Sequence, residues 1–382
     1  MNIGFDGKRA ANNLTGLGNY SRFVISQLVK SHPQNQYFIY TSKIKDYPQI
    51  NVFLKLKGIA LKLKKTKLPL WRSLGIKKQL IEDKLDLYHG LSHEIPMGLG
   101  TILPAIVTIH DVIFLLFPNN FGVIDRIIYK FKLGYACKSA DHIIAISERT
   151  KQDIIQFFNV DEQKISVIYQ SCDDIFKVPA NQDLKEEVKE RYQLPENYIL
   201  TVGTIEKRKN LVTLISALSK TKTDYKLIVV GKMTSFIAEV NAEIVRLNLQ
   251  SRVIFLQDVS FNDLPSIYQM AEVFIYPSIY EGFGIPIIEA LYSGIPVVAA
   301  SGSCLEEAGG AYSIYVNPHD ADGFAKALNG IINNPEVKSK MVANGLIHVA
   351  KFDNEKLSDQ MMETYKQTIT NFKDKYATKR DR

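Results

Sequence analysis

Cysteines and long hydrophobic runs are scarce in this sequence. Its 382 residues include three cysteines, Cys137, Cys172 and Cys304, which lie far apart along the chain. Isolated cysteines argue against a disulfide framework and a cysteine-rich metal site, and they fit a reducing compartment. No stretch of about 18 uncharged apolar residues occurs, so we expect no membrane-spanning helix. We therefore expect a cytoplasmic protein without a bound metal.

Repeats, low-complexity tracts and a signal-peptide pattern are also missing from the sequence. The hydrophobic fraction of 46% and the charged fraction of 23% are ordinary for a globular protein. A chain of 382 residues is longer than one hydrophobic core usually supports. Two domains are therefore expected.

Apolar segments typical of buried strands alternate with amphipathic segments, which predicts parallel sheets covered by helices. The expected strands are 3–6, 37–41, 59–63, 85–90, 105–110, 142–147 and 166–169, then 198–203, 225–231, 252–256, 273–277, 296–300 and 313–316. A polar stretch with two prolines, 178–196, separates the two series. The sequence thus predicts an α/β protein with two Rossmann-like domains, whose ligand crevices lie at the carboxyl ends of the strands.

The segment 281–291, with the sequence EGFGIPIIEAL, follows one of these strands and opens a helix. A helix start presents unpaired N–H groups that bind phosphate, and Gly282 and Gly284 would let a ligand approach the backbone closely. Glu281 and Glu289 would repel phosphate, so we expect them to accept hydrogen bonds from hydroxyl groups. The combination predicts a sugar nucleotide. The alternative is a helix start that Glu281 merely caps, with Glu289 in solvent.

Two cations, Arg208 and Lys209, follow the strand 198–203 and precede a helix that is expected to begin near Asn210. Cations at a helix start are unfavourable, because that end of the helix is itself positive. A bound anion would remove the conflict, and the forked donors of arginine with the mobile charge of lysine suit a diphosphate. A solvated basic turn is the alternative.

The glycine pair Gly16 and Gly18 lies too far beyond the first strand for a dinucleotide fingerprint. Ser21 stands where the third glycine belongs, and the second strand ends without an acid, so we do not expect NAD. We interpret the pair as part of a flexible loop that caps a helix over 19–30 and points it toward a ligand. A plain turn is the alternative.

His110 comes at the carboxyl end of the apolar run 105–109, where side chains of a parallel sheet face the ligand crevice. A histidine held by Asp111 or by the backbone, with a purely structural role, is the alternative. The other histidines have no comparable context.

Together these motifs resemble retaining GT-B glycosyltransferases of family 4, in the mannosyltransferase-like branch. The resemblance covers nearly the whole chain and rests on 6–7, 16–20, 110–111, 203–210 and 281–299. It implies an acceptor-binding domain at 1–178, a nucleotide-sugar-binding domain at 197–352 that faces it across a cleft, and a C-terminal helix at 353–382 that returns to the first domain. Thr204 departs from the pattern, because many relatives have arginine there. Arg208 then supplies the second cation.

The resemblance also implies residue roles. His110 would contact the transferred sugar, Arg208 and Lys209 the diphosphate, Glu281 the sugar hydroxyls, and Glu289 the ribose. The implied nucleotide-binding residues are Gly16, Gly18, Gly203, Lys232, Gly282, Phe283, Gly284, Ile285 and Glu289. No metal or cofactor is implied, and the leaving phosphate would act as the base in a front-face displacement.

The implied reaction moves a hexosyl group from a nucleotide sugar to a saccharide or polyprenyl-linked acceptor for a surface polysaccharide. GDP-mannose is the preferred donor, and UDP-sugars come next. A sugar-nucleotide epimerase of related fold and a catalytically silent sugar-nucleotide-binding protein are the rival interpretations.

The segment from Lys55 to Lys78 carries nine of the lysines and arginines, interleaved with leucines, Pro69 and Trp71. Such a mixture suits the surface of an anionic membrane. A solubilising charged edge is the alternative. Nucleic acid is not expected, because no nucleic-acid-binding module is recognisable. If the segment binds lipid, the protein would attach to the inner face of the membrane.

Overall fold

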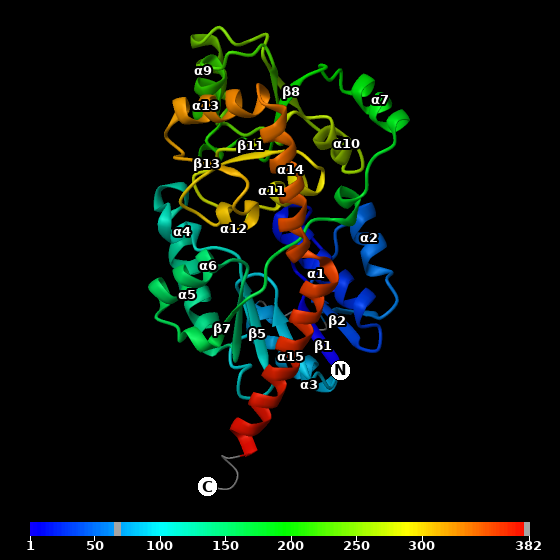
Figure 1. The fold of residues 1–382 in the computed structure, drawn as a ribbon. Coiled ribbons are helices and arrows are strands. Elements are labelled where there is room, and N and C mark those ends of the chain that lie inside the picture. Colours follow the sequence, from blue (N-terminus) through cyan, green and yellow to red (C-terminus); the bar gives the residue numbers. More distant parts are fainter. Residues whose placement is uncertain (65–69, 378–382) are drawn as a thin grey trace. The chain divides into compact units, whose positions relative to one another are not determined.

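The computed structural model describes residues 1–64 and 70–377, so Lys65 and Lys67 of the basic segment lie outside the described residues (Figure 1). The chain forms two compact units. Unit 1 comprises Met1–Gln170 and Phe352–Arg382, and unit 2 comprises Ser171–Lys351.

Unit 1 contains a sheet of seven parallel strands in the order β3-β2-β1-β4-β5-β6-β7. The strands are β1 (Asn2–Asp6), β2 (Gln36–Thr41), β3 (Ile59–Leu63), β4 (Leu87–Gly90), β5 (Ala105–Ile109), β6 (His142–Ala145) and β7 (Ile165–Val167). The α-helices are α1 (Gly16–Ser31), α2 (Pro48–Leu54), α3 (Lys77–Glu82), α4 (Ile113–Leu116), α5 (Val123–Ser139), α6 (Glu148–Phe158) and α15 (Asn354–Ala377). The strand order reverses between β1 and β4, which makes that point the ligand crevice of a doubly wound sheet.

Unit 2 contains six parallel strands in the order β10-β9-β8-β11-β12-β13. They are β8 (Tyr198–Val202), β9 (Lys226–Val230), β10 (Val253–Leu256), β11 (Val273–Tyr276), β12 (Val297–Ala300) and β13 (Ile314–Val316). The helices are α7 (Gln182–Arg191), α8 (Leu211–Ser219), α9 (Ile237–Arg246), α10 (Leu264–Gln269), α11 (Ile285–Tyr292), α12 (Leu305–Gly309), α13 (Ala321–Ile332) and α14 (Pro335–Val349). Here the order reverses between β8 and β11, so the loops after these two strands meet at one crevice.

The central strands are mostly buried because helices cover both faces of each sheet. All five residues of β5 are buried, as are all four of β11. Next to β11, β8 pairs in parallel register, with Val273 opposite Ile199 and Phe274 opposite Leu200. This register brings the carboxyl ends of β8 and β11 to the same edge of the sheet.

Helix α1 begins earlier than predicted, and this corrects the interpretation of the glycine pair. The helix starts at Gly16 rather than at residue 19, so Gly16 and Gly18 form its first turn instead of a flexible loop before it. A Cβ at Gly18 would lie 1.9 Å from the carbonyl oxygen of Asn13. Gly18 therefore permits a close approach of the helix to the preceding loop, a packing reason that the sequence pattern did not reveal.

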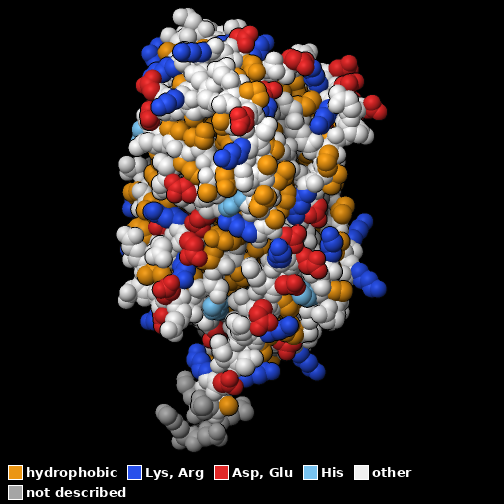
Figure 2. Space-filling view, in the orientation of Figure 1, with side chains coloured by type: hydrophobic (Ala, Val, Ile, Leu, Met, Phe, Trp, Pro, Cys, Tyr) orange, Lys and Arg blue, Asp and Glu red, His pale blue; other side chains and the backbone are white. Residues whose placement is uncertain are grey.

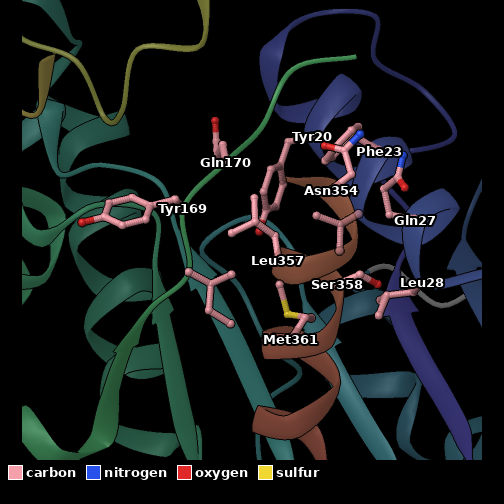
Figure 3. Close-up of a pocket in the computed structure, with 12 residues that line it drawn as sticks. Tyr20, Phe23, Gln27, Leu28, Tyr169, Gln170, Asn354, Leu357, Ser358 and Met361 are labelled. Atoms are coloured by element: carbon pink, nitrogen blue, oxygen red, sulfur yellow. The ribbon is translucent and has the colours of Figure 1, made fainter. Parts of the chain in front are cut away.

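The C-terminal helix α15 belongs to unit 1 and packs against α1 and β5. Figure 3 shows where α15 and α1 meet: a cavity of about 20 Å³ is bordered by Tyr20 of α1, by Leu357 and Met361 of α15, and by the segment 168–170. Deeper in unit 1, the buried hydroxyl of Tyr365 lies 2.7 Å from Nδ1 of His89. The His89 Nε2 atom is 2.8 Å from the Thr108 hydroxyl on β5, so a buried hydrogen-bond chain joins α15 to the sheet.

Tyr365→Phe should lower the free energy of unfolding by about 1–3 kcal/mol, because it leaves a buried nitrogen of His89 without its partner. Urea denaturation measures the change. Tyr129→Phe is the matched control: Tyr129 is 44% exposed in the same unit, and its substitution should change stability by less than about 0.5 kcal/mol. Equal stabilities for the two variants would contradict a stabilising role for the chain.

Candidate active site

The predicted cations and the first glutamate meet at the crevice of unit 2. The loop after β8 carries Arg208 and Lys209 in a short 3₁₀ turn, Lys207–Lys209, and the loop after β11 carries Glu281. The two cations are more than 70 positions from Glu281 in sequence, with Lys209 and Glu281 separated by 72. The strand order of the sheet brings them together.

One oxygen of Glu281 collects four donors. Its Oε1 atom lies 2.6 Å from Lys209 Nζ and 2.7 Å from Arg208 Nη1. The Tyr276 hydroxyl is 3.3 Å from the same oxygen, and the Ser278 hydroxyl also donates to it. The Glu281 side chain is only 13% exposed, so these bonds form in a largely dry environment, where charge-assisted hydrogen bonds are strong.

The two cations keep Glu281 ionised. Burial alone raises the pKa of this carboxyl, but the charges of Lys209 and Arg208 outweigh burial and lower the pKa to about 2. Burial lowers the pKa of Arg208, and the charge of Glu281 more than compensates and raises it. Glu281 and Arg208 are therefore both charged at neutral pH.

Further contacts balance and orient the cations. Arg208 Nη2 lies 2.6 Å from Oε1 of Glu206, and Nη1 also donates to the carbonyl of Tyr280. Lys209 Nζ is 2.7 Å from the Tyr276 hydroxyl and 5.0 Å from the centre of its ring. The sequence predicted that these two cations bind the diphosphate of a ligand. In the structure both are paired with carboxylates. The cluster is an oriented ion network rather than a bare positive patch.

Asn210 joins the two loops of the crevice. Its backbone is left-handed, with φ of 58°, a conformation that asparagine tolerates better than most residues. The side-chain amide donates to the carbonyls of Pro277 and Pro318, at 3.1 and 2.6 Å. The backbone N–H of Ile279 donates to the Arg208 carbonyl at 2.9 Å. The loops are thus held together independently of the charged side chains.

Two glycines allow the strand ends to approach each other. A Cβ at Gly231 would lie 2.0 Å from the carbonyl oxygen of Gly203, so only glycine fits there. Gly203 borders the cluster, because the Lys209 Cε atom is 3.6 Å from the position of a Cβ at this glycine. Lys232 is exposed just beyond, and its carbonyl accepts from the N–H of Ile205 at 2.9 Å.

The glycine-rich segment opens α11 as the sequence indicated. Gly284 precedes the helix with φ of 133°, and Ile285 is the first helical residue. Phe283 and Gly284 are buried and anchor the turn, whereas Gly282 is partly exposed. At the start of α11, Pro286 has no N–H, and the N–H groups of Ile287 and Ile288 donate to the Gly284 carbonyl at 2.9 and 3.4 Å. Backbone binding of an anion at this end of the helix would therefore fall to the turn 282–285.

Glu289 is on the next turn of α11 and differs sharply from Glu281. Burial raises its pKa to about 7, with a smaller contribution from Asp173. The Tyr268 hydroxyl donates to its Oε2 atom at 2.8 Å. Two carboxyl groups of one motif therefore have pKa values displaced in opposite directions, a separation typical of functional sites.

His110 and the start of α1 come together in unit 1. The rings of His110 and Tyr20, a residue of α1, are 4.5 Å apart and perpendicular. The His110 Nε2–H group donates to the Leu91 carbonyl at 2.9 Å, and the Gln170 amide donates to Nδ1 at 3.2 Å. Burial lowers the pKa of His110 to about 3, so the ring is neutral. Backbone and Gln170 thus fix the ring, and no sequence pattern pointed to Gln170.

A basic pocket of unit 1 was not predicted as a site. It has a volume of about 400 Å³ and lies at the carboxyl ends of β1, β2 and β3. The lining residues that the structure describes include six cations and no acid. The cations are Lys8, Arg9, Lys43, Lys45, Lys64 and Arg72. Arg72 is oriented by Asp6, at 2.9 Å, and by Glu94. The pocket combines part of the basic segment with loops that are distant in sequence.

Comparisons with known proteins agree with this architecture. The family described as "Glycosyl transferases group 1" matches residues 183–348, and the family described as "Glycosyltransferase Family 4" matches residues 16–174. The chain is similar in fold to Anabaena Alr3699/HepE, whose crystal structure was determined in complex with UDP and glucose. The TM-score is 0.76 and the identity is 18%, over 96% of this chain and 100% of that one.

Two curated relatives carry related names. O-antigen chain mannosyltransferase RfbU of Salmonella typhimurium is 34% identical over 250 residues, which are 65% of this chain and 66% of that protein. O-antigen chain mannosyltransferase B of Escherichia coli is 28% identical over 379 residues, which are 92% of this chain and 96% of that protein. With both units matched and the glutamate motif at the crevice of unit 2, the chain belongs to glycosyltransferase family 4 and has the GT-B fold.

Proposed function

We propose that this glycosyltransferase transfers mannose from GDP-mannose, with retention of configuration, to a growing saccharide of a surface polysaccharide. The observation that carries the proposal is the ion network of Arg208, Lys209 and Glu281 beside the start of α11. The names of the curated relatives support mannose and the polysaccharide.

Cleavage of the sugar–phosphate bond builds negative charge on the leaving diphosphate. Arg208 and Lys209, together with backbone N–H groups of the turn 282–285, would stabilise that charge as it develops. Glu281 keeps both cations in place and offers its carboxylate to sugar hydroxyls. The leaving phosphate would take the proton of the attacking hydroxyl, so the proposed front-face displacement needs no protein base.

The basic pocket of unit 1 supports an acceptor that carries phosphate. Six cations around about 400 Å³ would attract an anionic group more strongly than a neutral sugar. A polyprenyl-linked saccharide has such a group at the junction of lipid and sugar. We therefore propose that the pocket holds this phosphate, with His110 near the transferred sugar.

A thermal-shift panel of GDP, UDP and ADP tests the donor nucleotide. GDP should stabilise the full chain most, by about 2.7 kcal/mol at 100 times its Kd. Mannose transfer from GDP-mannose to a lipid-linked saccharide should follow. A larger shift with UDP would move the assignment to a UDP-sugar. Interconversion of sugar nucleotides without an acceptor would favour the epimerase.

Glu289→Ala should weaken nucleotide binding by about 1–3 kcal/mol if Glu289 holds the ribose hydroxyls. The ionised carboxylate is the better acceptor, and the pKa of Glu289 is about 7. Affinity should therefore rise between about pH 6 and 8, because ribose binding favours loss of this proton.

Calorimetry at several pH values measures this dependence. Glu289→Gln is the matched variant, since it keeps the shape and cannot ionise, and its affinity should be independent of pH in this range. If both variants bind the nucleotide with wild-type affinity, Glu289 does not hold the ribose hydroxyls.

A further inference from the structure

The last residue of β11, Tyr276, is buried beside the ion network of unit 2. It is 3% exposed, and its ring stacks against that of Phe274 with 5.9 Å between the ring centres. A buried tyrosine needs a hydrogen-bond partner for its hydroxyl. The partners of this hydroxyl are two charged side chains, which distinguishes Tyr276 from a tyrosine that only fills the core.

The Tyr276 hydroxyl has a defined orientation between Lys209 and Glu281. It accepts a hydrogen bond from Lys209 Nζ at 2.7 Å, and it donates to Glu281 Oε1 at 3.3 Å. An ammonium group can only donate and an ionised carboxylate can only accept. The hydroxyl therefore directs a lone pair at the lysine and its proton at the glutamate, so one oxygen satisfies both charged groups.

The side chain of Lys209 is also held by packing. Its Nζ atom lies 5.0 Å from the centre of the Tyr276 ring, within the range of a cation–π interaction. A Cβ at Gly203 would lie 3.6 Å from Lys209 Cε, so the lysine stem packs over a glycine. On the face drawn in Figure 2, Lys and Arg side chains are interspersed with Asp and Glu at the surface. An exposed lysine of that kind has many rotamers, whereas Lys209 is 18% exposed and has a defined position.

The ammonium group of Lys209 has three N–H donors. Within residues 1–64 and 70–377, its hydrogen-bond acceptors are Tyr276 and Glu281, which leaves one donor for an oxygen of the diphosphate. The Glu281 Oε1 atom is shared among Lys209, Arg208, Ser278 and Tyr276. The Tyr276 hydroxyl accepts from the lysine alone among these groups. It is therefore the contact that is specific to Lys209.

We propose that Tyr276 is the positioning residue for Lys209, and that its hydroxyl and ring direct the third N–H of the lysine at the leaving diphosphate. The inference rests on the proposed role of Lys209 in stabilising that charge, and it is independent of which nucleotide sugar is the donor. A displacement of about 1 Å can lower turnover by about 100-fold. The loss of a positioning contact should therefore appear in kcat more than in KM.

Tyr276→Phe tests the proposal, because it keeps the ring and removes the hydroxyl. It should lower kcat about tenfold or more, as expected for one hydrogen bond to a charged group, and change the KM of the donor by less than about twofold. Tyr198→Phe is the matched control. Tyr198 is 1% exposed on the neighbouring strand β8, and its hydroxyl donates to the Ile267 carbonyl at 2.6 Å. Both variants lose a buried hydrogen bond, so their melting temperatures should fall by similar amounts, whereas only Tyr276→Phe should lose kcat.

A second measurement shows whether the hydroxyl acts through the lysine. In a Lys209→Ala background, Tyr276→Phe should change kcat by less than about twofold, because the group that it positions is gone. An undiminished loss in that background would overturn the proposal. So would a normal kcat for folded Tyr276→Phe, or an equal fall in kcat for Tyr198→Phe.

The assays use the nucleotide sugar that the wild type turns over, so an incorrect donor is recognised in the wild type and does not resemble any of these results. No wild-type turnover with any GDP-, UDP- or ADP-sugar would contradict the proposed function, and the role of Tyr276 with it.

Discussion

Lys209→Ala should lower kcat by about two orders of magnitude or more, the loss expected when one donor to a developing oxyanion is removed. The diphosphate gains charge as the bond to the sugar breaks, so the lysine contributes more in the transition state than in the bound donor. A residue with that property affects kcat more than KM. Steady-state kinetics with a saturating acceptor separates the two parameters.

Lys207→Ala is the matched control for this prediction. Lys207 belongs to the same 3₁₀ turn but is exposed, and its removal should leave kcat nearly unchanged. Thermal unfolding of both variants checks that the turn is intact. A rise in KM for Lys209→Ala with normal kcat would mean that the lysine only binds the donor. Normal values of both constants would place it outside the site.

The fold could be predicted from the sequence because continuous apolar strands and their alternation with helices leave few arrangements. The meeting of Arg208, Lys209 and Glu281 follows from the same pattern, since β8 and β11 flank the reversal of strand order. Their pairing could not be predicted. Whether Glu281 faces a ligand hydroxyl or a cation depends on loop geometry that Asn210 imposes from another part of the chain.

Other features could not be predicted from the sequence because they depend on three-dimensional packing. The early start of α1 depends on how closely Gly18 approaches Asn13, and spacing does not encode that distance. The basic pocket gathers Lys8 and Arg9 with residues from three later segments, so no local run of charge marks it.

Glu281→Ala should cost about 3–5 kcal/mol of folding free energy, because it leaves two poorly exposed cations without their shared partner. Arg208 and Lys209 are 15% and 18% exposed. The native pKa of Glu281 is about 2, below the ordinary value of 4.5, so its ionisation stabilises the folded state above pH 4.5. That contribution disappears as the pH falls from 4.5 toward 2. The stability gap between wild type and variant should therefore be widest near neutrality and narrow in acid, as urea denaturation at a series of pH values would show.

The same variant distinguishes a structural ion network from a diphosphate site. Removal of the carboxylate increases the net positive charge around Arg208 and Lys209, so pyrophosphate and GDP should raise the melting temperature of Glu281→Ala by more than they raise that of wild type, even though transfer is lost. Glu206→Ala is the control. Glu206 is 41% exposed, and its ion pair is with Nη2 of Arg208. Its loss should therefore lower the free energy of unfolding by about 1 kcal/mol or less. If neither ligand stabilises Glu281→Ala beyond wild type, the cations serve the fold alone, and the role assigned to Lys209 in turnover falls with them.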